Sequence, residues 1–240
     1  MLEEAKTTVP KLSLSNVSSG YGPVAIIEAL SLAIAPGQIF ALMGKNGMGK
    51  TTVLKTILGF VALRSGDVRL DGMSMSGVSQ ASLIASGVGY APQEQALFQD
   101  LSVRDNLRLG LTGDVELDQR LERVAGWFPI LTSRLRQRAG TLSGGEQKML
   151  IVARGLIAEP SLLLLDEVTE GLQPSVVDRV SEVLAQASRE QGMAMLVVEQ
   201  HIPFVLGLAH RFAVFKRGEI VDEGAVDAES EARIERHMHL

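Results

Sequence analysis

The sequence predicts an α/β protein in which a mostly parallel β-sheet is covered by helices. Short apolar runs alternate along the chain with stretches of helical periodicity, which is the order typical of parallel strands joined by crossover helices. A glycine-rich segment also lies directly between an apolar run and a helical stretch. Four runs are continuous enough for strands buried on both faces: Ile39–Met43, Val88–Ala91, 162–165 and 195–198.

The remaining elements follow from local patterns. Residues 12–14 and 30–34 alternate with a period of two, which predicts antiparallel strands with one wet face, and Asp71-Gly72 marks a tight turn. The segment from about 95 to 138 is rich in Leu and Arg and contains Trp127, so we expect a helical insertion there. Helices are predicted at 50–58, 145–157 and 174–189, and a hairpin at 212–215 and 219–221.

Composition limits the classes of function. A chain of 240 residues is long enough for one α/β domain or a domain with a smaller satellite. Its net charge of −5 argues against nucleic acid as a partner, and the lack of cysteine excludes disulfides and thiolate metal sites. The first ten residues do not resemble a signal peptide, and no apolar run approaches the ~20 residues of a membrane span. We therefore expect any membrane role to come through a partner.

The glycine-rich segment 44–52 fits the phosphate-binding pattern G-x-x-x-x-G-K-[ST]. Its glycines leave backbone N–H groups free to point into a concavity that a di- or triphosphate can fill. Lys50 is expected to reach the β- and γ-phosphates and Thr51 to hold Mg²⁺, while the following helix directs its positive end at the anion. The candidate nucleotide-binding residues are Gly44, Lys45, Asn46, Gly47, Met48, Gly49, Lys50, Thr51 and Thr52.

Two carboxylates follow the apolar run 162–165. A buried strand there would deliver Asp166 to the same sheet edge as the phosphate loop, where it can bind Mg²⁺ through water. Glu167 is the candidate general base that orients and deprotonates the attacking water. On its own, the pattern also fits a strand that ends at a solvated acidic turn.

The segment 142–147 contains a second candidate phosphate-binding surface. Ser-Gly-Gly opens a predicted helix, so a hydroxyl and unpaired N–H groups converge at its positive end. A second such surface is useful mainly if it serves the nucleotide of a neighbouring molecule. The simpler alternative is a helix cap with flexible glycines. The candidate residues are Ser143, Gly144, Gly145, Glu146 and Gln147.

These motifs, in this order, resemble those of the ATP-binding cassette (ABC) ATPases, from Leu12 to Gly224. The resemblance implies that 142–147 is the signature motif, which completes the ATP site of an opposing subunit. It also implies that Tyr21 stacks on adenine and that Gln93 touches the Mg²⁺ and water region and senses a membrane subunit. His201 would then contact the γ-phosphate and hold the catalytic water.

The resemblance further implies the ABC ATPase fold, which is a P-loop NTPase (RecA-like) core with an antiparallel β subdomain and an inserted α-helical subdomain. We expect one such domain over 1–240. Its nucleotide-binding core would comprise 11–94 and 159–224, its helical subdomain with the signature motif 95–158, and its C-terminal tail 225–240. Val168 departs from the family, which usually has proline after the Asp-Glu pair; valine relaxes the restriction that proline imposes on the backbone beside Glu167.

The segment 169–174, Thr-Glu-Gly-Leu-Gln-Pro, resembles the ATPases of branched-chain amino acid importers and the closely similar urea and short-chain amide uptake ATPases. The resemblance implies ATP hydrolysis with Mg²⁺ on the cytoplasmic face of the membrane. The partners would be a second ATPase subunit (the same chain or a paralogue), two membrane permeases and, indirectly, a periplasmic solute-binding protein, with no nucleic acid. Two other classes stay open: an ABC ATPase outside transport and a non-hydrolysing nucleotide-dependent regulator.

Overall fold

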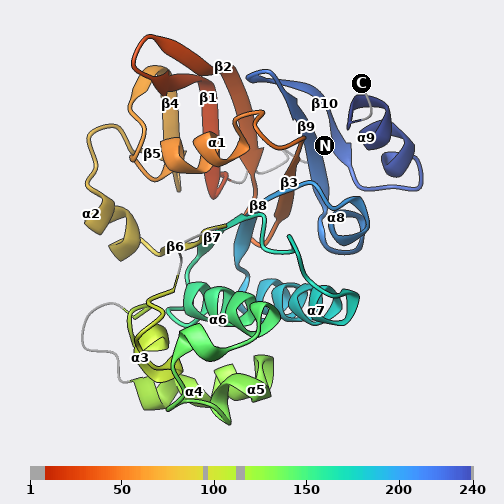
Figure 1. Ribbon diagram of the computed structural model, residues 1–240. Coiled ribbons are helices and arrows are strands. Elements are labelled where there is room, and N and C mark those ends of the chain that lie inside the picture. Colours follow the sequence, from red (N-terminus) through yellow and green to blue (C-terminus); the bar gives the residue numbers. More distant parts are fainter. Residues whose placement is uncertain (1–8, 94–96, 112–116, 239–240) are drawn as a thin grey trace, which may run out of the picture.

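The computed structural model describes residues 9–93, 97–111 and 117–238. Two β-sheets form its framework (Figure 1). The larger sheet has six strands in the order β10-β9-β3-β8-β7-β6, and the smaller has four in the order β2-β1-β4-β5. Helices cover the larger sheet, so the predicted α/β class is confirmed.

The larger sheet contains the four predicted buried strands. Its parallel strands are β3 (Ile39–Met43), β6 (Val88–Ala91), β7 (Leu162–Asp166), β8 (Ala194–Glu199) and β9 (Arg211–Lys216). Strand β10 (Glu219–Ala225) returns antiparallel to β9 through Arg217-Gly218, as the hairpin prediction required. Because the other strands are parallel, their carboxyl ends meet at one edge, which brings Met43, Asp166 and Glu199 to the same side.

The smaller sheet is antiparallel throughout and extends well beyond the segments predicted. Its strands are β1 (Leu12–Tyr21), β2 (Val24–Ile34), β4 (Leu63–Leu70) and β5 (Met73–Ser74). The predicted turn Asp71-Gly72 joins β4 to β5, and both of its residues have positive φ, 50° and 79°. Glycine adopts that conformation without steric cost and aspartate tolerates it.

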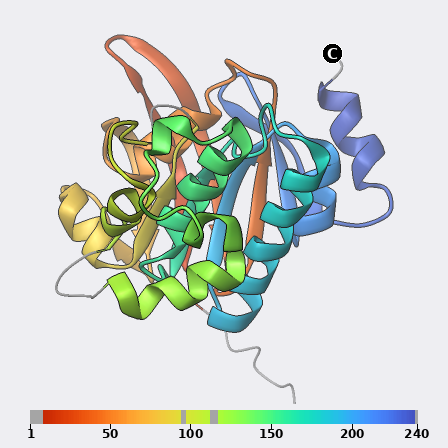
Figure 2. The same cartoon turned by 60° about the horizontal axis from the view of Figure 1, so that its bottom comes forward.

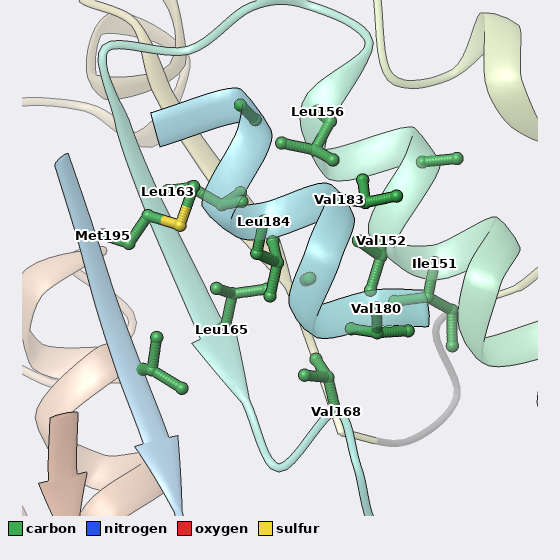
Figure 3. Close-up of a cluster of buried hydrophobic side chains, with 14 of the residues drawn as sticks. Ile151, Val152, Leu156, Leu163, Leu165, Val168, Val180, Val183, Leu184 and Met195 are labelled. Atoms are coloured by element: carbon green, nitrogen blue, oxygen red, sulfur yellow. The ribbon is translucent and has the colours of Figure 1, made fainter. Parts of the chain in front are cut away.

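Alternate residues of the central strands enter two separate cores. Leu163 and Leu165 of β7 face helices α6 (Gly144–Leu156) and α7 (Pro174–Gln191), where Figure 3 shows them opposite Val152 and Val180. The even-numbered residues of β7 pack on the other face, against α1 (Lys50–Ile57) and the smaller sheet. Since both faces of the sheet are covered at its centre, β3, β7 and β8 carry no polar residues until they reach their carboxyl ends.

The range 95–158 holds a group of helices at one end of the sheet, seen at the bottom of Figure 1. They are α3 (Val103–Arg108), α4 (Leu117–Trp127), α5 (Pro129–Thr132) and the 3₁₀-helix η1 (Ala139–Thr141), followed by α6. Trp127 is 4% exposed and belongs to the core shared with α6 and α7. Figure 2 shows these helices and α7 turned to the front of the molecule.

Three helices did not follow from the sequence patterns: α2 (Gln80–Ala85), α8 (Ile202–Leu208) and α9 (Ser230–Met238). Helix α2 is short, and the Ser79 hydroxyl caps it by accepting from the Ser82 N–H at 3.2 Å. Helix α9 lies in the range predicted as a C-terminal tail. Its Ile234 is fully buried and its Arg233 forms an ion pair with Asp222 of β10, so this range is docked on the domain.

Candidate active site

The phosphate loop connects the carboxyl end of β3 to α1. Gly47 and Gly49 have φ values of 80° and 99°, which side-chain-bearing residues rarely adopt. Gly44 is required for a steric reason, because a Cβ at this position would lie 2.5 Å from the Phe215 carbonyl oxygen. No side chain caps α1, so the N–H groups of its first turn remain available at the positive end of the helix.

Lys50 is the first residue of α1 and is 3% exposed. Its ammonium donates to the carbonyl oxygens of Gly44 at 2.7 Å and Lys45 at 3.0 Å. It also forms an ion pair with Glu167, with 2.8 Å between Nζ and Oε1. A buried cation is thus held among acceptors at the centre of the loop, where the sequence predicts phosphate oxygens.

Asp166 ends β7 and lies beside the phosphate loop, as the strand order requires. Its carboxylate accepts from the Thr51 hydroxyl at 3.1 Å and from the Tyr90 hydroxyl at 3.3 Å. The side chain is 1% exposed, and burial raises its pKa above the ordinary value. Burial, together with the Asp166 charge, also raises the pKa of Tyr90, which therefore remains a hydroxyl donor.

Glu167 has an unusual backbone conformation for its type, with φ of 45°. Its N–H donates to the Val198 carbonyl oxygen at 2.9 Å, and its carboxylate points back to Lys50. With the NH₂ group of its amide turned toward Glu167, Asn46 donates to both carboxylate oxygens at 2.9 and 3.2 Å. The next residue, Val168, is fully buried and packs in the α6–α7 core near Ile151 (Figure 3).

Gln93 connects this centre to the helical region. Its side-chain NH₂ donates to Glu167 and to Glu170, both at 2.8 Å. Its carbonyl oxygen accepts from the ammonium of Lys148 on α6, at 2.9 Å, and the same ammonium reaches the Glu167 carbonyl oxygen at 3.3 Å. Burial lowers the pKa of Lys148, while the surrounding carboxylates, Glu170 first, oppose that change.

A hollow of about 610 Å³ lies beside the phosphate loop and is lined by Tyr21, Thr51, Gln93 and Asp166. A second hollow of about 340 Å³ is lined by the loop itself, from Asn46 to Thr52, and by Gln93 and Glu167. Tyr21 lies at the end of β1 and is 50% exposed, so one face of its ring is available to a ligand. Thr51 and Gln93 line both hollows, which together make up one candidate nucleotide site.

The segment 142–147 lines neither of these two hollows and starts α6. Ser143 and Glu146 form a capping box: the Glu146 carboxylate accepts the Ser143 N–H at 2.9 Å, and the Ser143 hydroxyl accepts the Glu146 N–H at 3.4 Å. The Gln147 amide donates to the Leu142 carbonyl oxygen at 3.1 Å. Both long side chains are therefore used within the helix end, while Ser143 and Gly144 are exposed.

His201 is exposed at the start of α8, and its side chain makes no capping hydrogen bond to that helix. His201 lines neither hollow. Unlike Lys50, Thr51, Asp166, Glu167 and Gln93, it is therefore a predicted site residue that the structure does not place in the candidate nucleotide site. Among the described residues, no three His, Cys, Asp or Glu side chains are grouped as a metal site. A cation here would need hydroxyl, amide and ligand oxygens besides Asp166.

Four residues near the site were not predicted from the sequence: Tyr90, Lys148, Thr169 and Glu199. Tyr90 and Glu199 lie near the carboxyl ends of buried strands, so the same edge rule that selected Asp166 could have found them. Lys148 and Thr169 gave no such signal, because their contacts depend on how α6 and the loop after β7 pack.

Comparison with known proteins decides the family. The profile described as "ABC transporter" matches residues 27–170. The chain belongs to the ABC transporter family. It is 37% identical over 218 residues to the high-affinity branched-chain amino acid transport ATP-binding protein BraG of Pseudomonas aeruginosa, an alignment covering 89% of this chain and 93% of BraG. It is 30% identical over 217 residues to the lipopolysaccharide export ATP-binding protein LptB of Escherichia coli K12, covering 89% and 90%.

Solved structures place this ABC ATPase in the same fold class. The ADP conformation of MJ1267, an ATP-binding cassette of an ABC transporter, superposes with a TM-score of 0.85 at 21% identity, covering 95% of this chain and 96% of that one. The predicted ABC ATPase fold is thereby confirmed. The family profile and the similarity to BraG confirm the predicted ATP-hydrolysing activity. Within the described residues, none of the helices has the length and apolar character required to cross a membrane.

Proposed function

We propose that this ABC ATPase energises the import of branched-chain or other hydrophobic amino acids, through the site formed by its phosphate loop and the end of β7. One observation supports the site above all: five predicted residues converge at one sheet edge, where Lys50 and Gln93 both contact Glu167 and Thr51 contacts Asp166. In this arrangement Gly44–Thr52 surround the phosphates and Tyr21 stacks on the adenine.

Mg²⁺ fits the oxygen donors of this site. The Thr51 hydroxyl and the Asp166 carboxylate lie 3.1 Å apart, and Gln93 adds an amide oxygen once its side chain turns. Mg²⁺ is usually held by one or two carboxylates together with phosphates and waters, so the lack of a larger acidic cluster among the described residues agrees with it. When bound, the ion would neutralise charge on the phosphates and help to orient them.

The ion pair between Lys50 and Glu167 suggests how binding prepares the reaction. Phosphate oxygens compete with Glu167 for the Lys50 ammonium, since both are anionic and only one set can occupy its short contacts. Once Lys50 moves to the phosphates, the Glu167 carboxylate is free to accept a proton from the attacking water. Gln93 already donates to Glu167 and can orient that water, while His201 reaches the γ-phosphate only after its loop moves.

A second ATPase subunit would complete the site. The start of α6, with exposed Ser143 and Gly144 and half-buried Gly145, is absent from the lining of this chain's own nucleotide hollows, so we propose that it serves a neighbour. Glu146 and Gln147 support that surface by capping and bracing the helix end. Loss of the γ-phosphate would remove charge that holds the two faces together and favour their opening.

The permease partner is proposed to dock at a mostly apolar cleft of about 600 Å³ beside Tyr90. Phe60, Ile84, Phe98 and Leu109 line it and are each at least 49% exposed, which is unusual for side chains so large. Tyr90 lines both this cleft and the nucleotide hollow, so a docked helix would be next to Asp166 and Gln93. A periplasmic solute-binding protein would act through the permeases, and the ATPase would lie on the cytoplasmic face.

The substrate assignment rests on similarity to BraG. Urea or short-chain amide uptake is the alternative within the same mechanism, and lipopolysaccharide export is the rival favoured by similarity to LptB. The test is co-purification of the chain with the permeases encoded beside it, followed by reconstitution in proteoliposomes with the cognate binding protein. ATP-dependent uptake of radiolabelled leucine that is lost in Glu167→Gln supports the proposal. The proposal is contradicted if the assembly takes up urea and not leucine. It is also contradicted if an assembly that hydrolyses ATP takes up no solute.

A further inference from the structure

We propose that Glu199 is a positioning residue for ATP hydrolysis: its buried carboxylate joins the loop after Glu167 to the loop that carries His201. Glu199 is the last residue of β8 and is 1% exposed. It is not part of the phosphate loop, of the Asp-Glu pair or of the start of α6. The inference rests on the proposed roles of Glu167 and His201.

Both oxygens of Glu199 are occupied by donors from two separate segments. Oε1 accepts from the Thr169 N–H at 3.0 Å and from the Thr169 hydroxyl at 2.9 Å. Oε2 accepts from the Gln200 N–H at 3.1 Å. A carboxylate is costly to bury unless hydrogen bonds compensate it, and here the compensation comes from groups whose position affects the site. One side chain thus fixes residues two positions after Glu167 and one position before His201.

The backbone of Glu167 explains why such a clamp is needed. Its φ of 45° is unfavourable for a residue with a side chain, and such a conformation persists only where neighbouring contacts enforce it. The Val198 carbonyl oxygen holds the Glu167 N–H at 2.9 Å, and the Lys148 ammonium holds the Glu167 carbonyl oxygen at 3.3 Å. Glu199 supplies the third restraint through Thr169. The last two residues of β8 therefore hold the chain on both sides of the proposed general base.

Loss of this restraint should affect the chemical step more than nucleotide binding. Glu199 makes no hydrogen bond to the phosphate loop in the structure, so the contacts of Lys50 and Thr51 do not depend on it. Glu199→Gln keeps the size of the side chain but replaces one acceptor oxygen with an NH₂ donor. That NH₂ group must then face either the Thr169 N–H or the Gln200 N–H, which are donors themselves. A displacement of about 1 Å at a reacting group can reduce a rate by about 100-fold. We expect kcat for ATP to fall by about 10–100-fold, with KM and the nucleotide Kd within about twofold of wild type.

The experiment compares full-length wild-type protein with Glu199→Gln, and with Glu219→Gln as a control for an exposed glutamate on β10. Steady-state ATPase assays give kcat and KM, a fluorescent ATP analogue gives Kd, and hydrogen–deuterium exchange reports the backbone. In Glu199→Gln, amide exchange should rise in peptides covering 167–171 and 198–203 and stay unchanged in the phosphate loop. The control should match wild type. Unchanged exchange in those two segments, or an equal loss of kcat and nucleotide affinity, would overturn the inference.

Thr169 provides a second pair of variants that do not alter the buried charge. Thr169→Val removes only the hydroxyl bond to Glu199, and Thr169→Ser keeps it while removing a methyl group. We expect Thr169→Val to lower kcat by about 3–10-fold and Thr169→Ser to stay near wild type. Equal loss in both variants would mean that packing, not the bond to Glu199, matters. Glu167→Gln in the same series tests the base separately, since the exchange data on Glu199→Gln do not require activity.

Discussion

Glu167→Gln should destabilise the protein in the absence of nucleotide and make ATP a stronger stabiliser. The carboxylate of Glu167 and the ammonium of Lys50 are 5% and 3% exposed and lie 2.8 Å apart. Removing one partner of a buried ion pair typically costs about 3–5 kcal/mol. Glutamine retains a carbonyl oxygen for Lys50, so the expected loss is smaller, about 1–3 kcal/mol. For a chain of this size that corresponds to a melting temperature lower by about 2–12 °C.

ATP should reverse this effect because its phosphates supply the anionic partner that Lys50 has lost. In wild type, ATP must first separate Lys50 from Glu167, whereas in the variant that cost is largely absent. The ATP-induced rise in melting temperature should therefore be larger for Glu167→Gln than for wild type, while kcat falls by about 100–10,000-fold. Differential scanning fluorimetry with and without Mg²⁺-ATP measures the first effect and a steady-state assay the second.

Glu170→Gln is the matched control, because Glu170 also accepts from Gln93 but is exposed and has no contact with Lys50. It should melt within about 1–2 °C of wild type, with an unchanged ATP-induced shift. Similar melting behaviour of the two variants, or an ATP-induced shift in Glu167→Gln no larger than that of wild type, would contradict the proposed competition for Lys50.

Three further predictions concern the ligand, the core and the C-terminal helix. Tyr21→Ala should weaken ATP binding by the equivalent of about 1–3 kcal/mol of stacking while Tyr21→Trp retains it, measured by titration calorimetry; equal affinity in both variants would exclude stacking. Val168→Ala removes two methyl groups from a fully buried site and should lower the free energy of unfolding by about 1–3 kcal/mol in urea titrations, with the ATP Kd unchanged. The Arg233 ion pair lowers the pKa of Asp222, so its stabilisation of α9 is fully present above the unfolded-state pKa near 3.8 and is lost as pH falls through the lower folded value. Between pH 6 and pH 3, Asp222→Asn should therefore lose less stability than wild type, by at most about 1 kcal/mol in denaturant titrations.

The sequence was most informative where a function depends on consecutive residues. The phosphate loop needs glycines at fixed offsets, and the loop conformation with its positive φ values follows from that local requirement. Asp166 was placed correctly beside Thr51 because a continuous apolar run predicts a buried strand, and parallel strands end at one edge. Both predictions depend on local sequence patterns and on strand order, and neither requires the positions of the packed helices.

The parts that could not be predicted depend on packing between distant segments. The bond from Gln93 to Glu167 joins residues 74 positions apart, and the contact of Lys148 with the Glu167 carbonyl oxygen depends on the placement of α6. Helix α9 escaped prediction because its sequence is largely polar and only Ile234 is a fully buried apolar residue on it. A single fully buried apolar residue gives no hydrophobic periodicity, so the pattern of the chain did not predict that α9 docks on β10.

The charges around the nucleotide site predict that a single copy of this chain binds ATP weakly when Mg²⁺ is absent. Three ammonium groups, those of Lys50, Lys55 and Lys148, lie around the site with four carboxylates, those of Asp166, Glu167, Glu170 and Glu199. An added triphosphate increases the local negative charge, although burial already raises the pKa of Asp166. Besides the positive end of this chain's own α1, Mg²⁺ at Thr51 and Asp166 and the positive helix end of a second subunit at Ser143 would supply opposing charge. ATP affinity should therefore fall sharply when Mg²⁺ is chelated and rise on assembly of the two subunits; affinity indifferent to both would show that this excess of negative charge does not control binding.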